Sequence, residues 1–138
     1  MERRSRRSFL SLRSRGRRPE RTDVKIPTLL GKLPFVGQAE GERLTYYVFE
    51  GNRAYLVVSP NNRGGLNMSV VDQEVPEVIS RRFGGQRVTG GTLTEKGRRP
   101  DLFGDNFARL NALYTMVALG RAKKLKQRLG RAMVFKIK

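Results

Sequence analysis

The side chains with the clearest chemical capacity are cations, and they gather at the two ends of the chain. Residues 1–22 contain nine Arg and two Glu, and residues 121–138 contain eight Lys or Arg and no acidic residue. Residues 23–120 are nearly balanced, with twelve basic and ten acidic residues. Guanidinium and ammonium groups without acidic neighbours pair strongly with phosphate oxygens. The net charge of +17 therefore predicts a polyanionic partner, and nucleic acid is the common one.

We expect contacts with phosphates from an N-terminal arm, from a loop and from the C-terminal segment. The candidate residues are Arg3, Arg4, Arg6, Arg7, Arg13, Arg15, Arg17 and Arg18 in the arm, Arg98 and Arg99 in the loop, and Arg121, Lys123, Lys124, Lys126, Arg128 and Arg131 in the C-terminal segment. Contacts of this kind hold the backbone of a nucleic acid without reading its bases. No aromatic motif for single-stranded RNA is present, so double-stranded DNA is slightly favoured over RNA.

Catalytic and metal-binding chemistry has little support in the composition. The chain contains no Cys and no His, which removes disulfides, the commonest zinc ligands and the usual general base. The carboxylates Glu74, Glu77, Asp101 and Asp105 lie at the ends of expected helices, where they suit capping better than acid–base catalysis. We therefore predict a non-enzymatic protein without metal or cofactor. A small basic ribonuclease that uses Arg, Lys and Tyr is the one enzymatic class left open.

Residues 1–22 are Arg- and Ser-rich and contain too few apolar side chains to fold alone. They suit an arm that binds nucleic acid, and an organelle transit peptide is the alternative. Arg6-Arg7 resembles the start of a twin-arginine export signal, but Ser11 to Arg15 follow where an apolar segment is required. No apolar run of about 18 residues is present, so no transmembrane helix is expected. We expect an intracellular protein, cytoplasmic or nucleoid-associated, with organelle import left open.

The middle of the chain predicts antiparallel strands and then a short helix. Residues 23–42 are a Pro- and Gly-punctuated transition, where we place the start of the domain. The β-branched and aromatic runs on either side of Gly51-Asn52 predict a hairpin, and residues 66–72 predict a third strand. The aromatic side chains of the hairpin suit packing on a sheet better than base stacking. Residues 75–83 predict a short helix, which could begin a helix-turn-helix, although Gly90-Gly91 would weaken a recognition helix.

The glycine-rich stretch from Gly84 to Gly91 carries one family resemblance. Gly84-Gly85-Gln86, followed by Val88, resembles the catalytic GGQ loop of peptidyl-tRNA-hydrolysing release factors, whose small ribosome-rescue members also carry basic C-terminal tails. The resemblance implies a GGQ-type peptidyl-tRNA hydrolase. Thr89 stands where that family usually has Asn, and the predicted strands precede the loop instead of following it. The residues themselves predict a glycine turn, a short strand over residues 86–89 and a second turn.

The C-terminal third predicts a long helix and a terminal strand. Apolar residues recur at helical spacing from Phe107, so we expect a helix from Asp105 to Gly130 that is apolar in its first half and basic in its second. Alternation over residues 133–138 predicts a half-exposed strand that could join the meander. Residues 23–138 are thus expected to form a single α+β domain: a three-stranded antiparallel meander, a short helix, a long C-terminal helix and a terminal strand, behind an Arg-rich tail.

Two non-enzymatic functions fit these features. The first is a nucleic-acid-binding protein that contacts phosphates through the arm and the basic helix. The second is a structural RNA-binding component of a nucleoprotein particle, such as a ribosome or a virion. The sequence does not indicate an oligomeric state.

Overall fold

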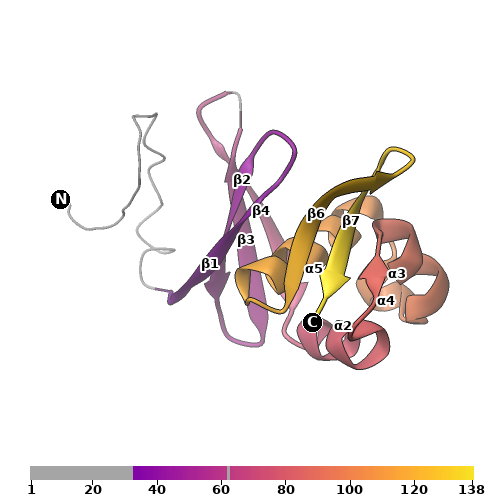
Figure 1. The fold of residues 1–138 in the computed structure, drawn as a ribbon. Coiled ribbons are helices and arrows are strands. Elements are labelled where there is room, and N and C mark those ends of the chain that lie inside the picture. Colours follow the sequence, from indigo (N-terminus) through magenta and orange to yellow (C-terminus); the bar gives the residue numbers. More distant parts are fainter. Residues whose placement is uncertain (1–32, 62) are drawn as a thin grey trace. The chain divides into compact units, whose positions relative to one another are not determined.

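The computed structural model describes residues 33–61 and 63–138, which belong to one compact unit. The eight arginines of the predicted arm, and residues 23–32 at the expected start of the domain, lie outside the described residues. The described part is an α+β fold with two antiparallel sheets and several helices, as Figure 1 shows. No helix in this part of the chain is long and apolar enough to span a membrane.

The first sheet is a four-stranded meander in the order β1-β2-β3-β4. Its strands are β1 (Phe35–Glu40), β2 (Thr45–Glu50), β3 (Ala54–Pro60) and β4 (Leu66–Asp72). The predicted hairpin and third strand are confirmed, and they correspond to β2, β3 and β4. The prediction of only three strands is wrong, because β1 forms in the segment we took for an irregular transition.

Gly37 is the reason that β1 escaped the prediction. A glycine inside a short apolar stretch suggests a break, and the β1–β2 register does shift between Phe35 and Gly37. The glycine is nevertheless required by packing, since a Cβ atom at this position would lie 2.5 Å from the backbone oxygen of Ala118. Gly37 therefore marks the place where the strand and a helix approach each other closely.

Four helices and a short strand follow the meander. They are α2 (Val75–Phe83), β5 (Arg87–Val88), α3 (Gly90–Gly97), α4 (Pro100–Phe103) and α5 (Asn106–Ala118). The predictions of α2 and β5 are confirmed. The prediction of a second glycine turn is wrong, because Gly90 and Gly91 form the first turn of α3. Thr89 caps this helix in a reciprocal pair of hydrogen bonds with Thr92. Glycines destabilise a helix less in its first turn than in its interior.

The prediction of a long basic helix that continues to Gly130 is also wrong, because α5 ends at Ala118. Gly120 takes a left-handed conformation with φ of 76°, and the chain then turns into β6 (Ala122–Leu129) and β7 (Ala132–Ile137). The cations expected on a helix therefore lie on a strand. The terminal strand exists as predicted, but it lies between β5 and β6 in a second sheet of order β5-β7-β6 and does not join the meander.

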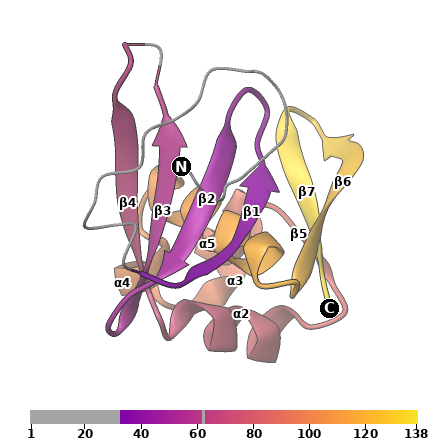
Figure 2. The same cartoon turned by 90° about the vertical axis from the view of Figure 1, so that its left-hand side faces the viewer.

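Helix α5 supplies the centre of a single core. Its residues Leu113 and Met116 are fully buried, together with Val48 of the meander and Phe135 and Ile137 of the second sheet. Figures 1 and 2 show α5 behind the meander, with the β6–β7 hairpin beyond it. Burial of this shared apolar surface joins the two sheets into one packed unit.

Candidate nucleic-acid interface

Three cations lie directly opposite one another across the second sheet. Arg87 of β5 pairs with Lys136 of β7, and Lys136 pairs with Lys123 of β6. Residues paired in this way share a face of the sheet, with Cβ atoms about 5 Å apart. The neighbours Val88 and Ile137 are buried in the core, so strand alternation directs the three cations away from it. We call Arg87, Lys123 and Lys136 the cation row.

The cation row is held in place by neutral acceptors. Arg87 Nη1 donates a hydrogen bond to the side-chain oxygen of Gln127 (3.3 Å), and Lys136 Nζ donates one to the carbonyl oxygen of Gly85 (2.6 Å). Neither acceptor carries a charge. The row is therefore oriented without being neutralised, although like charges directly opposite each other destabilise a sheet.

The same face continues one position along the strands. Lys138 lies two residues beyond Lys136, and its backbone N–H donates to the carbonyl oxygen of Arg121 (3.0 Å). Arg121 forms an ion pair with Glu77 of α2 (2.7 Å). Arg121 is thus the one cation of this face whose charge is compensated by a carboxylate among the described residues.

The predicted Lys123, Lys124 and Lys126 do not form one surface. Lys123 and Lys124 are consecutive strand residues, so they point to opposite faces. Lys124 Nζ approaches the carbonyl oxygen of Gly41 in the β1–β2 turn (3.5 Å) and is partly buried. Lys126 lies in the irregular part of β6 between Lys124 and Arg128 and is exposed.

The turn of the β6–β7 hairpin carries two more of the predicted cations. Arg128 forms an ion pair with Glu42 of the β1–β2 turn and donates to the carbonyl oxygen of Arg131 (2.9 Å). Arg131 itself is exposed and pairs with no acidic residue among those described. The ion pair fastens one side of the hairpin to the meander and leaves Arg131 at its tip.

The predicted loop pair, Arg98 and Arg99, lies between α3 and α4 and not on the second sheet. Arg98 is exposed and takes a left-handed conformation (φ 58°) at the end of α3. Arg99 binds Glu74 through both terminal nitrogens (3.0 Å each) and Asp101 through Nη2 (2.8 Å). These hydrogen bonds and charges lower the pKa of the Glu74 and Asp101 carboxyl groups and raise that of Arg99. Arg99 is thus part of a structural ion-pair cluster.

Asp105 and Gln86, two other polar residues singled out from the sequence, have structural partners. Asp105, which with Asp101 is one of the two expected caps of this helix, caps α5 by accepting from the backbone N–H of Ala108 (2.8 Å). In the glycine-rich loop, the backbone N–H of Gln86 donates to Phe83 and its carbonyl accepts from Ile137 (2.8 and 2.9 Å). The Gln86 side chain donates to the carbonyl of Arg82 (3.4 Å). Burial raises the pKa of Tyr114 to about 12, and within residues 33–61 and 63–138 no cluster of acidic side chains could hold a metal ion.

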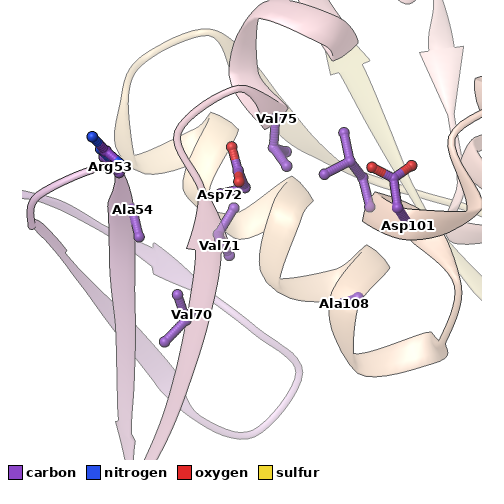
Figure 3. A pocket seen from close by; sticks show the side chains of 9 residues that line it. Arg53, Ala54, Val70, Val71, Asp72, Val75, Asp101 and Ala108 are labelled. Atoms are coloured by element: carbon purple, nitrogen blue, oxygen red, sulfur yellow. The ribbon is translucent and has the colours of Figure 1, made fainter.

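A groove of about 350 Å³ lies between the end of β4 and the helices α4 and α5, and no residue of the cation row lines it (Figure 3). Val70, Val71, Leu102 and Ala108 make much of its wall apolar, and its charged lining residues are Arg53, Asp72 and Asp101. Comparison with protein-family models, with curated proteins and with solved structures finds no match for the chain.

Sequence reasoning missed Arg87 and Lys136. The alternation of residues 133–138 does place Lys136 on the exposed face, and Arg87 falls within a predicted strand. The pairing of these two strands is the missing information, because β5 and β7 lie almost fifty residues apart.

Proposed function

We propose that the protein binds nucleic acid through its phosphates and catalyses no reaction. The cation row lies within the described residues, and the Arg-rich arm supplies further contacts. The observation that carries the proposal is the alignment of three cations on adjacent strands, two of them oriented by neutral acceptors, without a carboxylate between them. A phosphate backbone removes the repulsion that this alignment creates in the free protein.

The dimensions of the row suit a nucleic-acid strand. Neighbouring β-strands are about 4.8 Å apart, so three strands place their outer cations roughly 10 Å apart. Each strand of a duplex presents a phosphate for about every 3.4 Å of helix axis, so the row spans about three phosphates. Lys126 and Arg131 extend the positive surface along the hairpin.

Double-stranded DNA remains the favoured partner. A two-stranded β-ribbon fits the major groove, and Figure 1 shows the turn of the β6–β7 hairpin projecting beyond the helices. Residues Asn111–Met116 of α5 are buried, so this helix has little surface with which to read a groove, and phosphate contacts from the hairpin side suit the protein better.

A structural RNA-binding role in a nucleoprotein particle is the second candidate. The nine arginines of residues 1–22 favour it, because Arg-rich segments can order on structured RNA. The two candidates differ in their preferred ligand, which a comparison of duplex DNA, duplex RNA and single strands measures directly.

The test is a salt series of fluorescence-anisotropy titrations with a labelled DNA duplex. Reversal of two charges in the row, K123E with K136E, should weaken binding strongly and reduce the slope of log K against log salt by about two, roughly one for each lost phosphate contact. Lys96 of α3 is exposed and lies off the second sheet, so K96E is the charge-matched control for each single variant, K123E or K136E, and should leave the slope nearly unchanged.

Three results would count against the proposal. Affinity that does not depend on salt excludes phosphate contacts. Equal losses in K96E and in each single row variant, K123E or K136E, mean that net charge alone matters and that the row is no site. Cleavage of a labelled RNA strand in a parallel assay, abolished by substitutions in residues 33–138, would show a ribonuclease instead.

A further inference from the structure

Strand β4 is an edge of the meander, and the described residues place no strand on its outer side. Hydrogen bonds at the two ends of the β3–β4 hairpin, from Asn61 N to Gly65 O (3.0 Å) and from Gln73 N to Arg53 O (3.1 Å), fix which residues bond to β3. Backbone groups alternate in direction along an antiparallel pair. Those directed to the free edge belong to Leu66, Met68, Val70 and Asp72.

This edge lacks the usual protection against another strand. Exposed edges normally carry Lys, Pro, a bulge or a covering segment. Residues 66–71 contain no charged residue and no proline, and their register with β3 is regular. Met68 and Val70 are 54% and 69% exposed, which is unusual for large apolar side chains two residues apart on one face.

We propose that β4 pairs with β4 of a second copy of this chain, antiparallel, about a two-fold axis through Ser69. Ser69 is the midpoint of Leu66–Asp72, so only this register overlaps all seven residues. It places each Met68 opposite a Val70 and each Ser69 opposite the other Ser69. The apolar side chains meet on the outer face, and the free backbone groups of both edges are satisfied.

The local charges at β4, unlike the net charge of the chain, suit a second copy as the occupant. Two chains of net charge +17 repel each other, and the neutral stretch of β4 is a surface where they can approach. Arg63 precedes β4 and Asp72 ends it, so the two-fold axis brings opposite charges toward each other at each end. In Figure 2 the β6–β7 hairpin lies at the opposite side of the domain, so pairing through β4 keeps the two cation rows apart.

The groove of Figure 3 gives the second strand room. It opens beside Val70, Val71 and Asp72 at the end of β4. The two meanders would then form one eight-stranded sheet. The inference does not depend on nucleic-acid binding, since it rests on β4 alone.

Disulfide trapping tests the register, because the chain has no native cysteine. Ser69 would face Ser69 in a non-hydrogen-bonded pair with Cα atoms about 4.5 Å apart, within the range of a disulfide. S69C should therefore give a covalent dimer under mild oxidation. Asn67 lies on the same face of the same strand, but the two copies of residue 67 would be offset by four residues, about 13 Å. N67C is thus the matched control and should stay largely uncrosslinked.

Sedimentation equilibrium on the full chain tests the dimer without new thiols. V70K should raise the dissociation constant of the dimer at least tenfold. Leu129 is also 69% exposed, but on the hairpin, so L129K is the matched control and should leave the dimer intact. Circular dichroism checks that each variant is folded. A wild-type monomer at tens of micromolar, a V70K dimer of unchanged affinity, or equal crosslinking of S69C and N67C would each overturn the proposal.

Discussion

The contact between Gly37 and the end of α5 gives the sharpest test of the packing. In G37A the new Cβ atom would lie 2.5 Å from the carbonyl oxygen of Ala118, about 0.9 Å inside the 3.4 Å at which ordinary contact begins. The obstacle is backbone in the last turn of a buried helix, so no flexible side chain can move aside. Overpacking of this kind costs about 1–3 kcal/mol, and we expect the upper part of that range because β1 must separate from α5.

Urea unfolding followed by circular dichroism measures the effect, and G91A is the matched control. Gly91 lies in the first turn of α3. A Cβ atom added there would have the Thr89 hydroxyl oxygen as its nearest neighbour, at 3.6 Å. Alanine is favoured over glycine in a helix by up to about 1 kcal/mol, so G91A should be neutral or slightly stabilising. The two variants make the same chemical change with opposite expected signs. A G37A protein within about 0.5 kcal/mol of wild type would refute the close packing of β1 on α5.

The two ionisation predictions concern acid and alkaline stability. Arg99 lowers the folded-state pKa of Glu74 and Asp101, so the ion-pair cluster adds stability above the unfolded-state pKa values that is lost as pH falls through the folded ones. R99Q should therefore flatten the fall in unfolding free energy between about pH 5 and pH 3, and an unchanged slope would argue against the cluster. The pH dependence that Tyr114 contributes has the opposite direction. Burial raises its folded-state pKa to about 12, so the stability it contributes is present below the unfolded-state pKa and is lost as pH rises toward 12. Y114F should reduce this alkaline loss in the same urea titrations, whereas a wild-type pH profile would show that the phenol does not titrate as a buried group.

Patterns confined to short segments were predicted well. The runs around Gly51-Asn52 predict β2 and β3, the end signals of residues 75–83 predict α2, and Asp105 is one of the two aspartates predicted to cap α5. Each of these depends on neighbours within a few residues, where alternation, helix caps and turn residues act directly.

The prediction of a helix over residues 121–130 is wrong because contacts with a distant part of the chain decide the structure there. Lys, Arg, Leu and Ala are good helix formers, so residues 121–130 favour a helix when considered alone. Pairing with β7 stabilises a strand instead, and the glycines at positions 120 and 130 adopt the left-handed turns that permit it. The cation row was missed for the same reason, because cross-strand neighbours cannot be derived from spacing along the chain.

The shared burial of α5 has a consequence for how the domain could be divided. One side of the helix completes the core beneath the meander, and the other completes the core beneath the second sheet. A cut in the link between Asp72 and Val75 would therefore leave two incomplete pieces. The N-terminal piece would expose the inner face of its sheet, and the C-terminal piece would expose an apolar side of α5. The two sheets therefore fold as one cooperative unit, and a variant that unfolds one should unfold both.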